Sequence, residues 1–254
     1  MSFPDISMRR LGLTAAAAIA VVAFAGTAAA QSMVVRSTGP SAGKYPTGTK
    51  LKSTDKLTLA AGDKIVLMQA GKTRTLSGPG TFGATGQIQA NQNMGATVTR
   101  MLSTGPTMRS RGGFSRGPND PAPIYARAPN LWLLDYREGG TFCVVDPATL
   151  LLWRPNMDTD ELLSIEHGGK TEKVALVELS NFRKWPTDLM PVEYGTDYRL
   201  SGAGLAAPVT VRFTKMDAIP DTVEGSVDLL MAKGCGPQLN RLVDAMSESE
   251  TSGG

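Results

Sequence analysis

A serine motif near the start of the chain has the residue types of a catalytic nucleophile. The segment Gly39–Gly43 has the form G-x-S-x-G, in which Ser41 would attack a carbonyl carbon and a histidine would take its proton. His167 is the single histidine of the sequence, so it would have to be that base. The nucleophile must also sit on a strand–turn–helix, whereas the sequence KYPTG that follows is typical of turns. We therefore interpret the motif as a structural turn.

Two further glycine motifs have the residue types of nucleotide-binding loops. Gly78–Gly83 has the form G-x-G-x-x-G, which in a dinucleotide site opens a helix and is followed by an acidic residue about 20 positions later. A proline inside the motif opposes a helix, and no acidic residue occurs between Asp63 and Asp120. Gly71–Thr73 matches the end of a P-loop, but Val66 replaces the first glycine of that motif. Neither motif predicts a nucleotide site, and no cofactor is expected.

Two groups of carboxylates could serve metal binding or catalysis. Asp158, Asp160 and Glu161 lie together, but an EF-hand calcium loop needs more ligands and a glycine, so we expect a solvated loop. Asp135 and Glu138 are carboxylates that a periplasmic hydrolase could use, although the sequence defines no acid–base pair between them. We expect no catalytic residue and no metal site, and we keep the hydrolase as the alternative.

The histidine and the three tryptophans allow structural and functional interpretations. His167 precedes two glycines, which predicts a solvated hairpin-turn residue, with a general base or pH sensor as the alternative. Trp132 and Trp153 lie in apolar segments and are expected in the core. Trp185 precedes a proline and is the tryptophan expected to be exposed, where it could join a sugar-stacking surface.

The first thirty residues have the organisation of a secretory signal peptide. Arg9-Arg10 precede the apolar run Leu11–Ala25, and Ala28–Ala30 supplies the small residues that a signal peptidase recognises. We expect cleavage between Ala30 and Gln31, which would leave a periplasmic or secreted chain with no transmembrane segment. An uncleaved membrane anchor and export by the twin-arginine route are the alternatives.

Export gives the two cysteines a structural interpretation. Cys143 and Cys235 form an even pair, and an oxidising compartment favours their joining as a disulfide. A redox-active pair is the alternative, but it needs close spacing such as C-x-x-C, which these residues lack. We expect a disulfide that attaches the helical end of the chain to the strand that carries Cys143.

Charge is divided unevenly along the chain. Residues 31–119 hold twelve Lys or Arg and two Asp or Glu, a formal net charge of +10, whereas residues 120–254 hold twelve and twenty, a net charge of −8. The basic half predicts contact with an anionic envelope polymer, a membrane surface or another envelope protein. Alternatively, it lies against the acidic half or is merely solvated. Nucleic acid is not an expected partner, because no aromatic residues interleave with the basic ones. The candidate anion-binding residues are Lys72, Arg74, Arg100, Arg109, Arg111 and Arg116.

Alternating apolar residues predict a chain that is mainly β. The strands expected in the first part are 34–36, 57–59, 64–68 and 73–76. Those expected in the second part are 131–135, 141–145, 150–153, 172–179 and 209–213. The end of the chain changes period, because Leu239, Leu242, Val243 and Met246 have helical spacing, and residues 227–233 predict a shorter helix before them.

Three segments, Thr49–Leu51, Leu57–Asp63 and Gly71–Phe82, resemble the FecR-like β module of bacterial exported proteins. In that family a strand leads into a Gly-Asp turn, an apolar strand, a second glycine turn and a polar strand. The resemblance implies a small all-β module in the first part of the chain. The sequences TFCVVDP and KGCGPQL are similar to those of exported proteins that combine such a module with a second domain, which implies architecture and no activity.

Together these features predict a mainly β protein with a small FecR-like β module and a second strand-rich, β-sandwich-like domain that ends in a short helical segment. We expect a non-enzymatic binding or assembly protein of the bacterial cell envelope. The expected organisation is a signal peptide at 1–30, the FecR-like module at 31–83, a helix with a Gly/Pro/Arg-rich basic linker at 84–127, the strand-rich domain with C-terminal helices at 128–247 and a disordered tail at 248–254.

Overall fold

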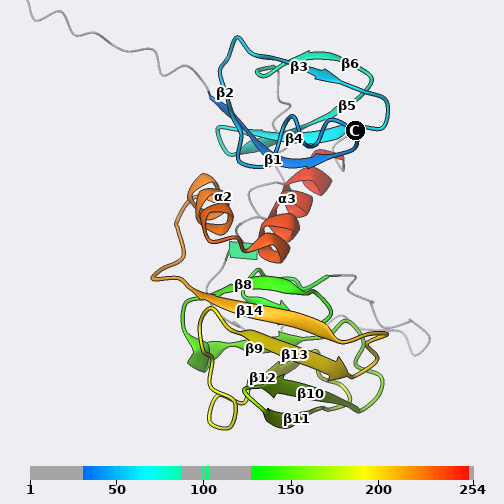
Figure 1. Cartoon of the computed structure of the whole chain (residues 1–254), viewed down its shortest axis with the longest axis vertical. Helices are drawn as coiled ribbons and strands as arrows, with labels where there is room; N and C mark the ends of the chain where they lie inside the picture. The colour runs from blue at the N-terminus through cyan, green and yellow to red at the C-terminus, as the bar shows by residue number, and fades with distance from the viewer. Residues whose placement is uncertain (1–30, 87–98, 100, 103–126, 252–254) are drawn as a thin grey trace, which may run out of the picture.

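The structure is a computed structural model that describes residues 31–86, 99, 101–102 and 127–251. Its described part is mainly β, as the sequence predicts. Strands β1–β6 form one end of the molecule, strands β7–β14 form the other, and helices α2 and α3 lie between them (Figure 1). Within the described residues, no helix is long and apolar enough to cross a membrane.

The first unit consists of a four-stranded antiparallel sheet covered by a two-stranded one. The larger sheet has the order β2-β1-β4-β5, and β3 pairs with β6. Because side chains alternate along a strand, the apolar run of β4 faces two ways. Ile65 and Leu67 pack towards β3 and β6, while Val66 and Met68 pack towards the helices. The strands are β1 (Ser32–Thr38), β2 (Lys50–Leu51), β3 (Lys56–Leu59), β4 (Lys64–Gln69), β5 (Lys72–Ser77) and β6 (Gly80–Gly83).

The second unit packs a five-stranded sheet against a three-stranded one, as expected of a sandwich-like domain. The larger sheet has the order β11-β10-β13-β14-β8, and the smaller has the order β12-β9-β7. Leu134 and Leu152 of the smaller sheet share a core with Leu163 and Phe213 of the larger. The strands are β7 (Leu133–Asp135), β8 (Gly140–Val144), β9 (Leu151–Trp153), β10 (Glu161–His167), β11 (Lys170–Leu176), β12 (Phe182–Lys184), β13 (Asp197–Gly202) and β14 (Val209–Lys215), with a 3₁₀ helix η1 at Pro147–Thr149.

The helical layer joins the two units through one apolar core. Helix α2 (Val223–Ala232) begins after Thr222, whose side chain accepts a hydrogen bond from the N–H of Gly225 and caps the helix. Helix α3 (Gly236–Thr251) contacts β8 at one end and β5 and β1 at the other. Their core contains residues of β1 and β4 together with Leu131, Cys143 and Met216 of the second unit. The four α3 residues with helical spacing are buried in this core, as predicted: Leu239, Leu242, Val243 and Met246.

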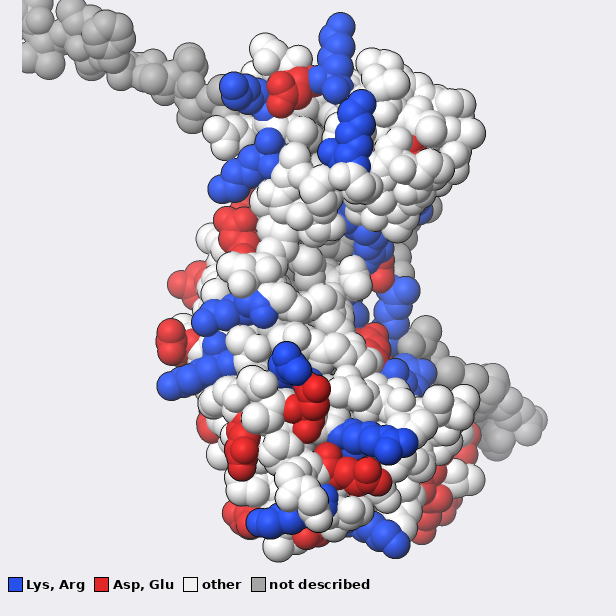
Figure 2. Space-filling view, viewed as in Figure 1, with Lys and Arg blue, Asp and Glu red and all other residues white. Residues whose placement is uncertain are grey.

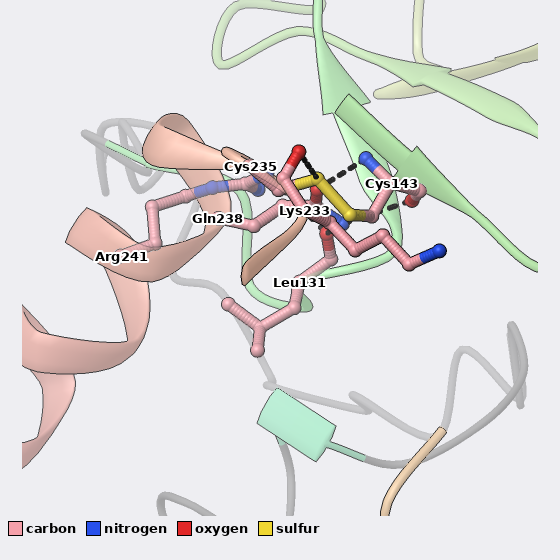
Figure 3. Close-up of a disulfide and its surroundings, with 6 residues drawn as sticks. All are labelled: Leu131, Cys143, Lys233, Cys235, Gln238 and Arg241. Atoms are coloured by element: carbon pink, nitrogen blue, oxygen red, sulfur yellow. Dashed lines mark hydrogen bonds between the residues drawn. A yellow bond between two sulfur atoms is a disulfide. The ribbon is translucent and has the colours of Figure 1, made fainter. Parts of the chain in front are cut away.

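The predicted disulfide between Cys143 and Cys235 is present in the structure. Cys143 lies on β8 and Cys235 lies between α2 and α3, and their Cα atoms are 5.7 Å apart (Figure 3). Gln238, in the first turn of α3, is fully buried beside the bond. Its Oε1 accepts the N–H of Cys143 at 2.6 Å, and its Nε2 donates to the carbonyl oxygens of Cys143 and Leu131, each at 3.1 Å. The bond and this side chain together hold the start of α3 against the sheet.

The strands predicted from alternation are confirmed, apart from shifts of a few residues at their ends. Two central strands, β10 and β13, were not predicted from the sequence. The expectation for Trp185 is wrong: its side chain is 1% exposed, and its Nε1 donates to the carbonyl oxygen of Met190 at 2.7 Å. In the segment 84–127, where a helix and a basic linker are expected, Thr99, Met101 and Leu102 are described and helical, and residues 87–98, 100 and 103–126 lie outside the described residues.

Replacing both cysteines by alanine should lower the free energy of unfolding by about 3–5 kcal/mol, because the bond closes a long loop and restricts the unfolded chain. The two residues are separated by 92 positions. Urea unfolding of wild type and the double variant measures the difference. Equal stability of the two proteins would contradict this account of the bond.

Candidate functional site

Some of the predicted anion-binding residues lie within the described part of the chain, and the others lie outside it. Lys72 and Arg74 lie on β5, on the same face of that strand. Lys72 follows Gly71. A Cβ built on Gly71 would lie 2.6 Å from Oε1 of Glu224, so this acidic side chain lies close to the turn before Lys72. The other predicted residues, Arg100, Arg109, Arg111 and Arg116, lie outside the described residues.

Arg74 belongs to a basic cluster at the end of β6. Its Nη1 donates to the carbonyl oxygen of Gly83 at 3.1 Å, and Lys56 of β3 is the residue paired with Gly83. The turn that carries Lys52 lies alongside, because the N–H of Ala84 donates to the carbonyl oxygen of Asp55 at 2.8 Å. We call Lys52, Lys56 and Arg74 the basic cluster.

Both carboxylates of the first unit accept hydrogen bonds from backbone N–H groups. Asp63 is buried and accepts the N–H groups of Ala60 at 2.5 Å and Ser41 at 2.8 Å. The hydrogen bonds from Ser41 hold the pKa of Asp63 below its ordinary value. Asp55 accepts the N–H of Lys52 at 2.8 Å. Both carboxylates therefore stabilise turns.

The basic cluster keeps its positive charge available to a partner. Among the described side chains of residues 31–86 and 127–247, none that is acidic forms an ion pair with Lys52, Lys56 or Arg74. Lys52 and Lys56 are exposed, and Arg74 is half-buried. Figure 2 shows Lys and Arg side chains around the β1–β6 end, with little acidic surface among them. Such a surface can attract anions by charge and by N–H donors.

A second group of basic residues is bound within the molecule, and the sequence analysis missed its role. Arg36 of β1 and Arg127 both form ion pairs with Asp244 of α3. Nη2 of Arg36 also donates to the carbonyl oxygen of Asn240 at 2.8 Å. Part of the basic half therefore does contact the acidic half, through one aspartate.

The carboxylates considered for a hydrolase are each held by an arginine. Asp135 is buried, and Arg137 donates to its two oxygens at 2.9 and 2.6 Å. Oε2 of Glu138 lies 3.4 Å from Nε of Arg241. Burial raises the pKa of Glu138 and lowers the pKa of Arg241. Proton transfer by either carboxylate would have to break an existing pair, so this geometry favours a structural role for both.

The burial and the contacts of Arg241 have no signal in the sequence. Its side chain is 2% exposed and donates to the carbonyl oxygens of Leu133 at 3.1 Å and Asn130 at 3.2 Å. These carbonyls lie at the start of β7, and that of Asn130 also accepts the N–H of Leu133 at 3.4 Å. The buried guanidinium adds hydrogen bonds to both carbonyls and fixes α3 to β7.

His167 is packed rather than solvated, which corrects one expectation. It ends β10 at the predicted hairpin, but its side chain is 16% exposed and its ring stacks on Tyr198 with centroids 4.1 Å apart. One ring nitrogen lies 2.9 Å from the carbonyl oxygen of Asp197 and the other 3.3 Å from Glu193. Ser41 lies in the first unit, beyond the helical layer, so the two residues of the supposed triad are not brought together.

Comparison with known protein families, with curated proteins and with solved structures finds no match for this chain. The FecR-like resemblance therefore stays a prediction.

Replacing Arg241 by methionine should lower the free energy of unfolding by about 3 kcal/mol, because the buried carbonyls and Glu138 lose their partner. The matched control is Arg199→Met, since Arg199 is exposed and lies 3.9 Å from Glu166. That change should cost less than about 1 kcal/mol. Chemical unfolding tests both, and equal losses would contradict the role given to Arg241.

Proposed function

We propose that this chain is an exported, non-enzymatic binding or assembly protein of the bacterial cell envelope, and that the basic cluster contacts an anionic partner. The observation that carries the proposal is that no acidic side chain of residues 31–86 and 127–247 forms an ion pair with Lys52, Lys56 or Arg74. Residues 31–86 hold eight Lys or Arg and two carboxylates, so this unit has a net positive charge. Such a surface steers anions towards it and binds them by charge-assisted hydrogen bonds.

The shape of the cluster suits an extended anion rather than a small one. Arg74 is tied by one nitrogen to Gly83, while the two lysines are exposed on the neighbouring strand and turn. The Arg74 guanidinium lies directly against Gly86, where the Cβ of any other residue would clash with it. An anionic envelope polymer, a membrane surface or an acidic protein could meet these groups. A periplasmic hydrolase is the less supported alternative, because its two carboxylates are held by arginines.

Two features support export. The first thirty residues have the order of a signal peptide, with basic, apolar and small residues in turn. The Cys143–Cys235 bond is of the kind that persists in oxidising compartments such as the periplasm.

The double variant Lys56→Gln/Arg74→Gln should bind dextran sulfate and phosphatidylglycerol vesicles roughly ten- to thirtyfold more weakly, because each cation near an anionic surface contributes about 1 kcal/mol. Binding of the wild type should also weaken as salt rises, since screening shortens the reach of charge to about 8 Å at physiological ionic strength. Dissociation constants at low and physiological salt test both points.

The matched control is Lys44→Gln/Lys64→Gln, which removes the same charge elsewhere on the unit. Lys64 begins β4 and Lys44 lies in the loop held to Asp63 through Ser41, so both are at the other end of β3 from Lys56. An equal loss in the two variants would show that binding follows net charge and would contradict the assignment to the cluster.

Export predicts the N-terminus of the mature protein. Material recovered from the periplasm should begin at Gln31, because the small residues Ala28–Ala30 define the cleavage point. N-terminal sequencing or intact mass gives the answer. A chain that retains Met1 or Met8 would contradict cleavage.

A further inference from the structure

The second unit presents an exposed leucine among acidic side chains. Leu179 is 80% exposed, and its φ of 65° lies in the left-handed region. It belongs to the loop between β11 and β12, next to Glu178, and faces the loop between β9 and β10, which carries Asp158 and Asp160. All three acidic side chains are exposed. The N–H of Leu179 donates to the carbonyl oxygen of Met157 at 2.8 Å, which joins the two loops. We call residues 155–160 and 177–181 the acidic loops.

A buried arginine holds the acidic loops in one shape. The side chain of Arg154 is 2% exposed. Its guanidinium donates to the carbonyl oxygens of Val177 at 2.6 Å, Thr159 at 2.7 Å and Ser180 at 3.1 Å, which belong to both loops. Oδ1 of Asp160 also accepts the N–H of Glu178 at 2.6 Å. The surface is therefore preorganised, and a partner would pay little ordering entropy to bind it.

The contacts of the acidic loops hold Leu179 in a strained backbone conformation. A left-handed backbone crowds the Cβ of any residue except glycine, and asparagine or aspartate tolerate it better than leucine does. An exposed leucine gains nothing from burial that would offset this strain. Strained residues of this kind persist where the surrounding structure determines them and are common at binding sites. Burial of this apolar side chain by a partner would be favourable.

The acidic loops and the basic cluster cannot meet within one molecule. Strands β3 and β6 lie at one end of the long axis, and β10 and β11 lie at the other, with α2 and α3 between the two units (Figure 1). Arg36 makes the observed contact between the basic half and α3, and it belongs to neither surface. The two surfaces can therefore form ion pairs with each other only when they belong to different molecules.

We propose that the two surfaces bind each other between copies of this chain, so that the acidic loops of one copy dock on the basic cluster of the next. This inference rests on the proposed function, because it identifies the anionic partner of the cluster as a second copy. Leu179 then packs beside the cluster near Gly83, which is exposed and carries no side chain of its own. Because the contact joins two different surfaces, every assembly keeps one free surface of each kind at its ends, and association continues head to tail.

Two end-blocked variants of the full exported chain test this geometry. Lys56→Glu/Arg74→Glu blocks the basic end, and Asp158→Lys/Glu178→Lys/Leu179→Gly blocks the acidic end. In sedimentation velocity the wild type should grow in mass with concentration, and each variant alone should remain monomeric. Reversed charges oppose each other at such a contact and should weaken it by roughly tenfold or more. An equimolar mixture of the two variants should form a 1:1 dimer, because each supplies the surface that the other lacks.

Three results would overturn the inference: a wild type that stays monomeric at every concentration, a blocked variant that associates like the wild type, or a mixture that forms no dimer. The charge control is Asp228→Lys on α2, which should associate like the wild type. The proposed function fails separately. If the wild type is monomeric but binds dextran sulfate through Lys56 and Arg74, self-association is wrong and the anionic contact stands. If the basic-end variant both associates and binds dextran sulfate like the wild type, both fail.

Leu179→Gly alone separates a binding role from a structural one. Glycine relaxes the left-handed backbone, so the thermal midpoint should stay equal to that of the wild type or rise, while self-association weakens roughly tenfold because the central apolar contact is lost. Leu189→Ser, at another exposed leucine of the same unit, is the matched control and should leave association unchanged. Unchanged association in Leu179→Gly would overturn the docking role of this residue.

Discussion

The helical pair α2–α3 is buried on two sides at once, and the arrangement of all other elements depends on this burial. The four-stranded sheet of the first unit has two apolar faces. Strands β3 and β6 cover one, and Val66 and Met68 on the other contact the core of the helices. The second unit reaches the same core through Cys143 and Met216. A unit of this size buries too little apolar surface alone, so a layer contributed from the far end of the chain completes it.

This helical layer also determines how charge can act. It keeps the basic cluster and the acidic loops at opposite ends, so the strong charge segregation of the sequence is neutralised inside the molecule only in part, chiefly where Arg36 and Arg127 meet Asp244. The remaining charge faces outward. Helices α2 and α3 thus stabilise the fold and also separate two surfaces of opposite charge, the basic cluster and the acidic loops. The proposed binding and assembly role uses these two surfaces.

Buried polar side chains complete the irregular parts of the structure. Gln238 satisfies backbone groups beside the disulfide, Arg241 those at the start of β7, and Arg154 those of the acidic loops. In each place the side chain donates to backbone carbonyls of an irregular segment, and loss of a hydrogen-bond partner from a buried group costs about 1–3 kcal/mol. Arg241 in this way fixes helix α3 to the sheet, and Arg154 gives the acidic loops a defined conformation. One buried arginine therefore stabilises the packing, and the other shapes a surface.

Local patterns were enough to predict the strands with clear alternation, the helical spacing that ends in Met246, and the Cys143–Cys235 bond, because period and cysteine count are properties of the sequence itself. In β10 the exposed Leu162 beside the buried Leu163 interrupts the alternation, and β13 has only two apolar residues. The burial of Trp185, the packing of His167 on Tyr198 and the pairing of Lys56 with Gly83, to which Arg74 donates, depend on the tertiary fold. Only the tertiary structure decided them, because burial and contact between remote residues are set by how the layers pack and leave no periodic trace in the sequence.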